Sequence, residues 1–240
     1  MYGWRAKIGF MVPPGAPTVE VEMPRLAPPG VSVHFTRMDA SEGVGTHWGQ
    51  EERNRRQAAS VDECARLLAM VRPAVIVMAH TATSYTIGSE REAEIAARVE
   101  KSTGCRFITA FGSSLAALRE LGVKRIGLAT PYSEEITLIG KAHLEQHGIS
   151  VVRYAHLRDC PNVYEETPER AYTVARRADG EDVDAIFLSG VGMPTLPAIQ
   201  QLEDDLKKPV VSAAGCMMWN ALRTAGVDHR QPGYGRLFAR

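Results

Sequence analysis

Hydrophobic residues in this chain form short continuous runs that alternate with longer segments of helical spacing. A continuous apolar run is typical of a strand that is buried on both faces of a parallel sheet. The predicted strands are Lys7–Val12, Val31–Phe35, Ala74–Ala79, Arg106–Thr109, Arg125–Ala129, Ser150–Tyr154, Asp184–Ser189 and Pro209–Ser212. The predicted helices are Glu51–Arg72, Ser89–Ser102, Ser113–Leu121, Glu134–His147, Pro168–Arg177, Pro194–Leu206 and Cys216–Ala225. Alternating strands and helices predict an α/β fold.

The second half of the chain repeats the first half. Three pairs of segments match in the same order: Lys7–Gly15 with Arg125–Ser133, Ala74–Thr83 with Ala185–Thr195, and Arg106–Val123 with Val210–Val227. The repeat predicts two duplicated Rossmann-like (flavodoxin-like) lobes with parallel sheets, residues 1–122 and 123–212, with residues 213–240 packing back on the first lobe. Ligands bind at the carboxyl ends of strands in such sheets, so we expect the active site in the cleft between the lobes.

Charge and composition argue against nucleic acid and membranes as binding partners. The 28 basic and 28 acidic residues give a formal net charge of zero, which argues against a general nucleic-acid binder. No apolar stretch approaches the roughly 20 residues that span a bilayer, and the charged start MYGWRAKIGF does not resemble a signal peptide. We therefore expect a cytoplasmic protein without a membrane partner. The four cysteines show no metal-binding spacing and are expected to be free thiols: Cys64, Cys105, Cys160 and Cys216.

The candidate chemistry gathers where the two central strands end. His80 ends the first of them, and an imidazole there could serve as an acid or base or only as a hydrogen-bond donor. Gly190 lies at the matching position of the repeat, directly after Ser189. Hydroxyl groups of Thr81, Tyr132 and Ser189 and the backbone N–H groups after both strands could stabilise an enolate-like charge, although such residues also cap helices and pack turns. The segment Glu51–Arg56 is expected to be a solvated helix face.

Several motifs resemble the aspartate/glutamate racemase superfamily, in particular its branch with arylmalonate decarboxylase and maleate cis-trans isomerase. These motifs are KIGFMVPPG, the turn at Leu128–Tyr132, LSGVGMPTLPAI and the tail PGYGRLF. The resemblance implies two Rossmann-like lobes, no metal or organic cofactor, and a small carboxylate substrate between the lobes. It also implies that Thr81 and Tyr132 hold the substrate carboxylate, that Pro14–Gly15 and Gly190–Val191 form the pocket walls, and that the loop with His47 and Trp48 covers the substrate. Dimers are frequent among small enzymes of this superfamily, so a homo-oligomer is an open alternative.

The sequence departs from that superfamily at two positions. Racemases and maleate isomerases have a cysteine at each of two facing positions, and arylmalonate decarboxylase keeps the second; here they are His80 and Gly190. The expected activity is therefore decarboxylation beside a carboxylate through an enediolate, with His80, or water that it orients, as the proton source. The alternatives are isomerisation or racemisation of a small dicarboxylate or amino acid, and a family member that only binds a carboxylate. The sequence does not name the substrate.

Overall fold

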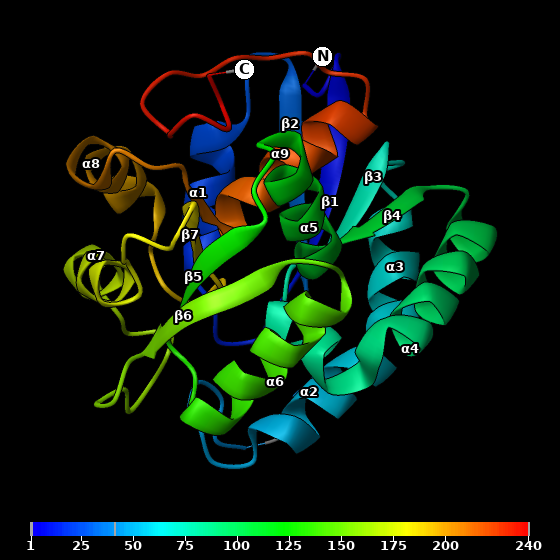
Figure 1. The fold of residues 1–240 in the computed structure, drawn as a ribbon. Helices are drawn as coiled ribbons and strands as arrows, with labels where there is room; N and C mark the ends of the chain where they lie inside the picture. Colours follow the sequence, from blue (N-terminus) through cyan, green and yellow to red (C-terminus); the bar gives the residue numbers. More distant parts are fainter. Residues whose placement is uncertain (1, 41, 240) are drawn as a thin grey trace.

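The structure, a computed structural model, describes residues 2–40 and 42–239 and contains two parallel four-stranded sheets (Figure 1). The first sheet has the order β2-β1-β3-β4 and consists of β1 (Ala6–Val12), β2 (Val31–Arg37), β3 (Val75–Met78) and β4 (Arg106–Thr109). The second has the order β6-β5-β7-β8 and consists of β5 (Arg125–Thr130), β6 (Ser150–His156), β7 (Ala185–Leu188) and β8 (Val210–Ser212). The same strand order in both sheets confirms the predicted duplicated α/β fold.

Helices cover both faces of each sheet. In the first half they are α1 (Thr18–Leu26), α2 (Gln50–Ala59), α3 (Val61–Ala69), α4 (Thr81–Thr103) and α5 (Ala110–Glu120). In the second half they are α6 (Glu134–Gln146), α7 (Pro168–Arg177), α8 (Leu196–Leu206) and α9 (Ala213–Thr224). Figure 1 shows α3 and α4 on one outer side of the molecule, α7 and α8 on the opposite outer side, and α5 and α9 between the sheets. The last helix, α9, packs against α5 and α1 of the first half.

One hydrophobic core joins the two sheets. Successive side chains of a strand point to opposite faces. Thus Phe10 and Val77 of the first sheet enter the same core as Leu128 and Phe187 of the second. The alternate residues face outwards, where Met78 packs under α3 and α4 and similar residues of β7 pack under α7 and α8. The shared core holds the carboxyl ends of β3 and β7 close together.

Three local elements differ from the sequence prediction by more than a shift of a few residues at an end. Helix α1 was not predicted; Pro24 lies inside it, although proline is rare in helix interiors. The predicted helix Glu51–Arg72 is divided into α2 and α3 at Ser60, whose hydroxyl donates to the Gln57 carbonyl at 2.9 Å and competes with the regular helical pattern. Helix α4 begins at Thr81 rather than near Ser89 and has a kink at Gly88, where φ is 76°.

In the part of the chain that the structure describes, none of the helices combines the length and the apolar character that crossing a membrane requires.

Candidate functional site

The ends of β3 and β7 occupy equivalent positions in the two lobes. The Ala79 N–H donates to the Met11 carbonyl at 2.9 Å, and the Ser189 N–H donates to the Ala129 carbonyl at the same distance. The next residues are His80 and Gly190, the two positions that the repeat predicts to face each other. The backbone turns sharply at Gly190, where φ is 109°, so this position favours glycine.

Buried hydroxyl groups connect the two lobes at these strand ends. The Thr81 and Tyr132 hydroxyls share a hydrogen bond of 2.9 Å, and the Ser189 hydroxyl lies 3.4 Å from the Thr81 hydroxyl. The Tyr85 hydroxyl extends the network with a hydrogen bond of 2.8 Å to Ser189. The Ala82 N–H also donates to the Tyr132 hydroxyl, and burial raises the pKa of Tyr132 well above its usual value. We call Thr81, Tyr132 and Ser189 the hydroxyl cluster; its members are neutral donors that can rotate towards a carboxylate.

His80 is buried beside this cluster and is neutral. Its Nδ1 shares a hydrogen bond of 2.8 Å with the Thr83 hydroxyl in the first turn of α4. Burial, and to a smaller extent the positive charge of Arg53, lowers the pKa of His80 to about 3. At neutral pH the imidazole therefore accepts or donates one hydrogen bond at Nε2 without carrying a charge.

A small cavity of about 20 Å³ lies between the lobes at His80. Its lining residues are Gly45, Thr46, Gln50, Arg53, Asn54, Gln57, His80, Tyr132, Val163 and Tyr164. A cavity of this size accommodates about one water molecule and is too small for a dicarboxylate. Substrate entry therefore requires movement of the segment that covers the cavity.

The covering segment is the loop of residues 42–49, which contacts the second lobe. The Val163 N–H donates to the Gly45 carbonyl at 2.8 Å, and His47 Nε2 shares a hydrogen bond of 2.9 Å with the Pro131 carbonyl. Of the two residues that the resemblance implied as a cover, His47 makes such a contact, whereas Trp48 is 77% exposed and points to solvent. The loop is thus closed over the cavity.

The structure places the remaining predicted wall residues around the cavity rather than in its lining. A Cβ atom at Gly15 would overlap Val44 and would lie 2.9 Å from Tyr164 Cδ2, so glycine there allows the loop to close. The Pro14 carbonyl accepts a hydrogen bond of 2.9 Å from the Arg37 guanidinium. The Val191 side chain is buried in the core that the two sheets share.

Helix α2 contributes side chains to the site that the sequence did not indicate. Arg53 and Asn54 are 4% and 1% exposed, so the prediction that residues 51–56 form a solvated face is wrong for these two residues. Both side chains line the cavity together with Gln50 and Gln57. These four residues share one face of the helix, but polar residues also cover the other face, so the sequence held no signal for which face is buried.

Helix α1 fixes the loop that follows β7. The Thr18 hydroxyl donates to the Gly192 carbonyl at 2.8 Å. Glu22 Oε1 accepts from the N–H groups of Thr195 and Leu196 at 2.8 and 2.9 Å, at the start of α8. Burial raises the pKa of Glu22 to about 7. These contacts hold the backbone around Gly190 against the first lobe.

The cysteines lie outside the cavity lining. All four are buried free thiols: Cys64, Cys105, Cys160 and Cys216. Burial raises the pKa of Cys216 to about 12, and burial together with Glu166 does the same for Cys160. Within residues 2–40 and 42–239, no cluster of three or more His, Cys, Asp or Glu side chains is placed to hold a metal ion.

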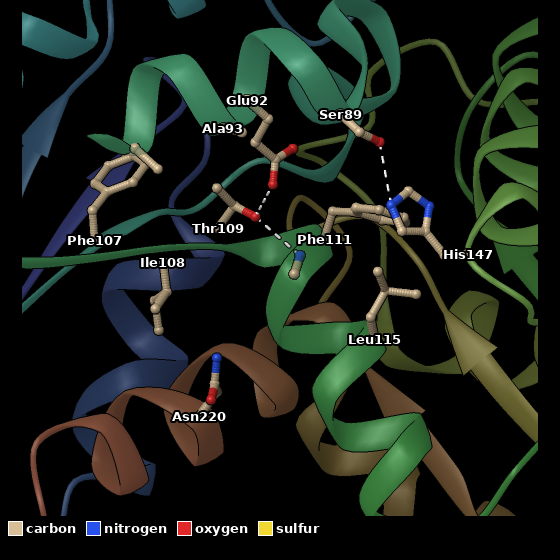
Figure 2. A pocket seen from close by; sticks show the side chains of 12 residues that line it. Ser89, Glu92, Ala93, Phe107, Ile108, Thr109, Phe111, Leu115, His147 and Asn220 are labelled. Carbon is tan, nitrogen blue, oxygen red and sulfur yellow. Dashed lines mark hydrogen bonds between the residues drawn. The ribbon is translucent and has the colours of Figure 1, made fainter. Parts of the chain in front are cut away.

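A second, larger cavity has a volume of about 380 Å³. Figure 2 shows its lining side chains, which come from α4, β4, α5, α9 and the end of α6. The Thr109 hydroxyl donates to Glu92 there, and the Ser89 hydroxyl lies 3.2 Å from His147 Nε2. This cavity shares no lining residue with the cavity at His80. None of the predicted site residues lines this larger cavity, whereas His80 and Tyr132 line the smaller one.

Comparison with known proteins identifies the family. Residues 8–238 match the family described as arylmalonate decarboxylase. The chain is 31% identical to arylmalonate decarboxylase from Bordetella bronchiseptica, over 96% of this chain and 95% of that protein. It is 28% identical to maleate isomerase from Alcaligenes faecalis, over 97% and 96%. Among solved structures, the chain is similar to a cysteine-to-serine mutant of Nocardia farcinica maleate cis-trans isomerase with a covalently bound succinylcysteine intermediate. The TM-score is 0.88, the sequence identity is 29%, and the alignment covers 98% of each chain.

These relatives are a decarboxylase and isomerases, and the Nocardia farcinica isomerase has the same fold as this chain. The resemblance inferred from the sequence motifs is therefore confirmed, and the chain is a cofactor-free lyase or isomerase that belongs to the arylmalonate decarboxylase family.

Proposed function

We propose that this enzyme decarboxylates a malonate-type dicarboxylate through an enediolate intermediate. One observation carries the proposal. All three members of the hydroxyl cluster lie together where the carboxyl ends of β3 and β7 meet, whereas neither His80 nor Gly190 carries a thiol. Decarboxylation requires donors that stabilise an enediolate, but it does not require a sulfur nucleophile.

The hydroxyl cluster is suited to hold the carboxylate that the substrate retains. Thr81 lies in the first turn of α4, so the positive end of the helix dipole also points towards this position. When CO₂ leaves, negative charge accumulates on the retained carboxylate. Donors that are already in place bind this enediolate more strongly than the substrate, and this difference lowers the barrier.

The proton for the enediolate comes from water that is hydrogen bonded to His80. The low pKa of His80 leaves little imidazolium at neutral pH, so Nε2 orients a water molecule rather than delivering its own proton. The water protonates the α-carbon, and the remaining hydroxide combines with the released CO₂. The balanced reaction is R–CH(CO₂⁻)₂ + H₂O → R–CH₂–CO₂⁻ + HCO₃⁻.

Isomerisation is the alternative activity in this family. The Nocardia farcinica relative forms a covalent succinylcysteine intermediate, which requires a thiol in contact with the substrate. In this chain no cysteine lines the cavity at His80, and the pKa values of Cys160 and Cys216 are raised away from the thiolate form. These observations support decarboxylation over a thiol-dependent isomerisation.

The test is incubation of the purified protein in D₂O with substituted malonates, maleate and acidic amino acids, followed by NMR. We expect loss of CO₂ from a malonate and one deuterium at the α-carbon of the product. Tyr132→Phe removes a donor from the hydroxyl cluster and should lower kcat about 100-fold or more, as the loss of an oxyanion donor does in other enzymes. Tyr154→Phe, which changes a tyrosine on the surface strand β6, is the matched control and should retain activity.

Other outcomes would replace the proposal. Conversion of maleate to fumarate without CO₂ release would assign the isomerase activity. Exchange of an amino-acid α-hydrogen with loss of optical rotation would assign a racemase. Full activity of Tyr132→Phe on malonates would show that the hydroxyl cluster does not bind the enediolate.

A further inference from the structure

Helix α2 directs a row of polar side chains into the protein. Gln50, Arg53, Asn54 and Gln57 are at most 9% exposed, whereas Glu51, Glu52, Arg55 and Arg56 of the same helix are exposed. We call the four buried residues the α2 polar face. Burial of polar groups is unfavourable unless they have hydrogen-bond partners, so an inward polar face requires an explanation.

The folded chain satisfies this face only in part. The Asn54 amide donates to the Ala82 carbonyl at 3.2 Å and to the Thr86 hydroxyl at 2.8 Å. By contrast, the Oε1 atoms of Gln50 and Gln57 are buried without a hydrogen-bond partner. These two oxygens are acceptors, so they can receive an N–H or O–H of a ligand but cannot bind an anion. The cationic donor of the face is Arg53.

Arg53 is the charged centre of the face. Its guanidinium donates to the backbone carbonyls of Thr46 and Trp48 in the covering loop. Among the residues that the structure describes, no carboxylate forms an ion pair with it. Desolvation lowers its pKa from the usual arginine value, which means that the cation is held at a cost in free energy. The two carbonyl oxygens occupy donor sites that an anion would occupy more favourably.

The position of Arg53 links it to the reacting centre. It lines the same cavity as His80 and Tyr132, on the α2 side. Its charge reaches His80, since it contributes to the lowered pKa of that imidazole. An anionic group on Arg53 would thus belong to a ligand whose reacting carbon lies at His80 and whose retained carboxylate lies on the hydroxyl cluster.

We propose that the α2 polar face binds an anionic substituent of the substrate, with Arg53 as the anion-binding residue. The substrate class is then a malonate whose 2-substituent carries a carboxylate, rather than an arylmalonate. The guanidinium fork matches a carboxylate with two parallel hydrogen bonds. This inference deepens the proposed decarboxylation and rests on it for the identity of the reacting carboxylates.

The anion bound by Arg53 is the substituent rather than either carboxylate of the malonate. A cation that contacts the departing carboxylate would stabilise the ground state and raise the barrier to loss of CO₂. The retained carboxylate already has the hydroxyl cluster. An aryl substituent would fit poorly, because it would cover the Arg53 guanidinium without offering its N–H groups an acceptor.

The experiment compares two malonates of nearly the same shape. Carboxymethylmalonate carries an anionic substituent, and isobutylmalonate carries a neutral one. The wild-type enzyme should favour carboxymethylmalonate in kcat/KM, and Arg53→Gln should reduce this preference about 10- to 100-fold, the range expected for loss of a charged hydrogen bond. Arg55→Gln, an exposed arginine on the same helix, is the matched control and should leave the preference unchanged. Arg53→Lys keeps the charge without the fork and should retain part of the preference.

A second measurement does not require turnover. Calorimetry should show that succinate, the product expected from carboxymethylmalonate, binds the wild-type protein more tightly than 4-methylpentanoate, the product expected from isobutylmalonate, and that Arg53→Gln removes the difference. If this holds while no malonate is decarboxylated, the proposed reaction is wrong but the anion site remains supported.

Two results would overturn the inference and leave the proposed reaction in place. The first is equal or faster decarboxylation of isobutylmalonate or phenylmalonate by the wild-type enzyme, with the same ratio in Arg53→Gln. The second is a uniform fall in kcat/KM of Arg53→Gln for both malonates with an unchanged ratio, because Arg53 would then serve only to hold the covering loop.

Discussion

The buried carboxyl group of Glu22 makes the stability of this enzyme depend on pH in a direction opposite to that of most carboxylates. Glu22 is 2% exposed, and its Oε1 accepts two backbone N–H groups at the start of α8 while its Oε2 has no partner. Because burial outweighs these hydrogen bonds, the pKa rises from 4.5 to about 7 in the folded protein. The test is Glu22→Gln, which keeps an acceptor oxygen and removes the titration.

The sign and size of the effect follow from proton linkage. Protonated Glu22 contributes fully to the free energy of unfolding when the pH is below 4.5, the pKa of this side chain in the unfolded state. Between 4.5 and about 7 the unfolded state releases its proton and the folded state does not, so stability falls as the pH rises and is lost above about 7. A difference of about 2.5 pKa units corresponds to about 3 kcal/mol, most of which falls between about pH 5 and about pH 8.

Urea unfolding at several pH values, followed by circular dichroism, measures this effect. Relative to the wild-type protein, Glu22→Gln should gain about 2–3 kcal/mol in the free energy of unfolding between about pH 5 and about pH 8. Glu135→Gln, at an exposed position in the first turn of α6, is the control and should track the wild-type protein. A constant difference between Glu22→Gln and wild type across this range would refute the reasoning. A variant that becomes less stable than wild type at high pH would show that the ionised carboxylate is stabilised at the start of α8.

Three further outcomes test the site. Gly190→Ala places a Cβ atom 2.9 Å from Pro131 Cδ at a φ of 109° and should lower the free energy of unfolding by about 1–3 kcal/mol, measured by thermal unfolding. Gly148→Ala should lower it less, because nothing lies within 4 Å of a Cβ atom there, and equal losses would contradict the steric argument. Because the pKa of His80 is about 3, the titration of His80 should not change kcat/KM near pH 6.5. Glu22 titrates close to this pH, so the profile is also measured in Glu22→Gln, and an inflection near pH 6.5 that persists there would show that His80 titrates near its usual value. Gly15→Ala would displace Val44, so proteolysis within residues 42–49 should accelerate and KM should rise; unchanged cleavage would mean that the loop closes without this contact.

The architecture could be predicted because its signals are local and repeated. Continuous apolar runs such as the one that ends at His80 require burial on both faces, and three matched segment pairs specify the same lobe twice. Helix α1 and the first turn of α4 were not predicted, because their local sequence signals do not indicate a helix. Pro24 and the hydroxyl residues after His80 are locally compatible with turns, and tertiary packing overrode that preference.

The candidate site was predictable only where residues follow directly on a strand. His80, Thr81, Tyr132 and Ser189 could be placed together because parallel strands end at one edge of each sheet. Arg53 could not be placed in this way, since it lies on a helix whose composition is that of an exposed surface.

The sequence by itself determined the duplicated fold, the hydroxyl residues at the strand ends and the absence of a thiol at both facing positions. Each of these depends on residue type and on short-range spacing. Only the tertiary structure decided that Arg53 and the rest of the α2 polar face are buried, that His80 is neutral, and that Glu22 holds the loop after Gly190. Burial and pKa depend on which distant segments exclude water from a side chain, and that information is absent from any local stretch of sequence.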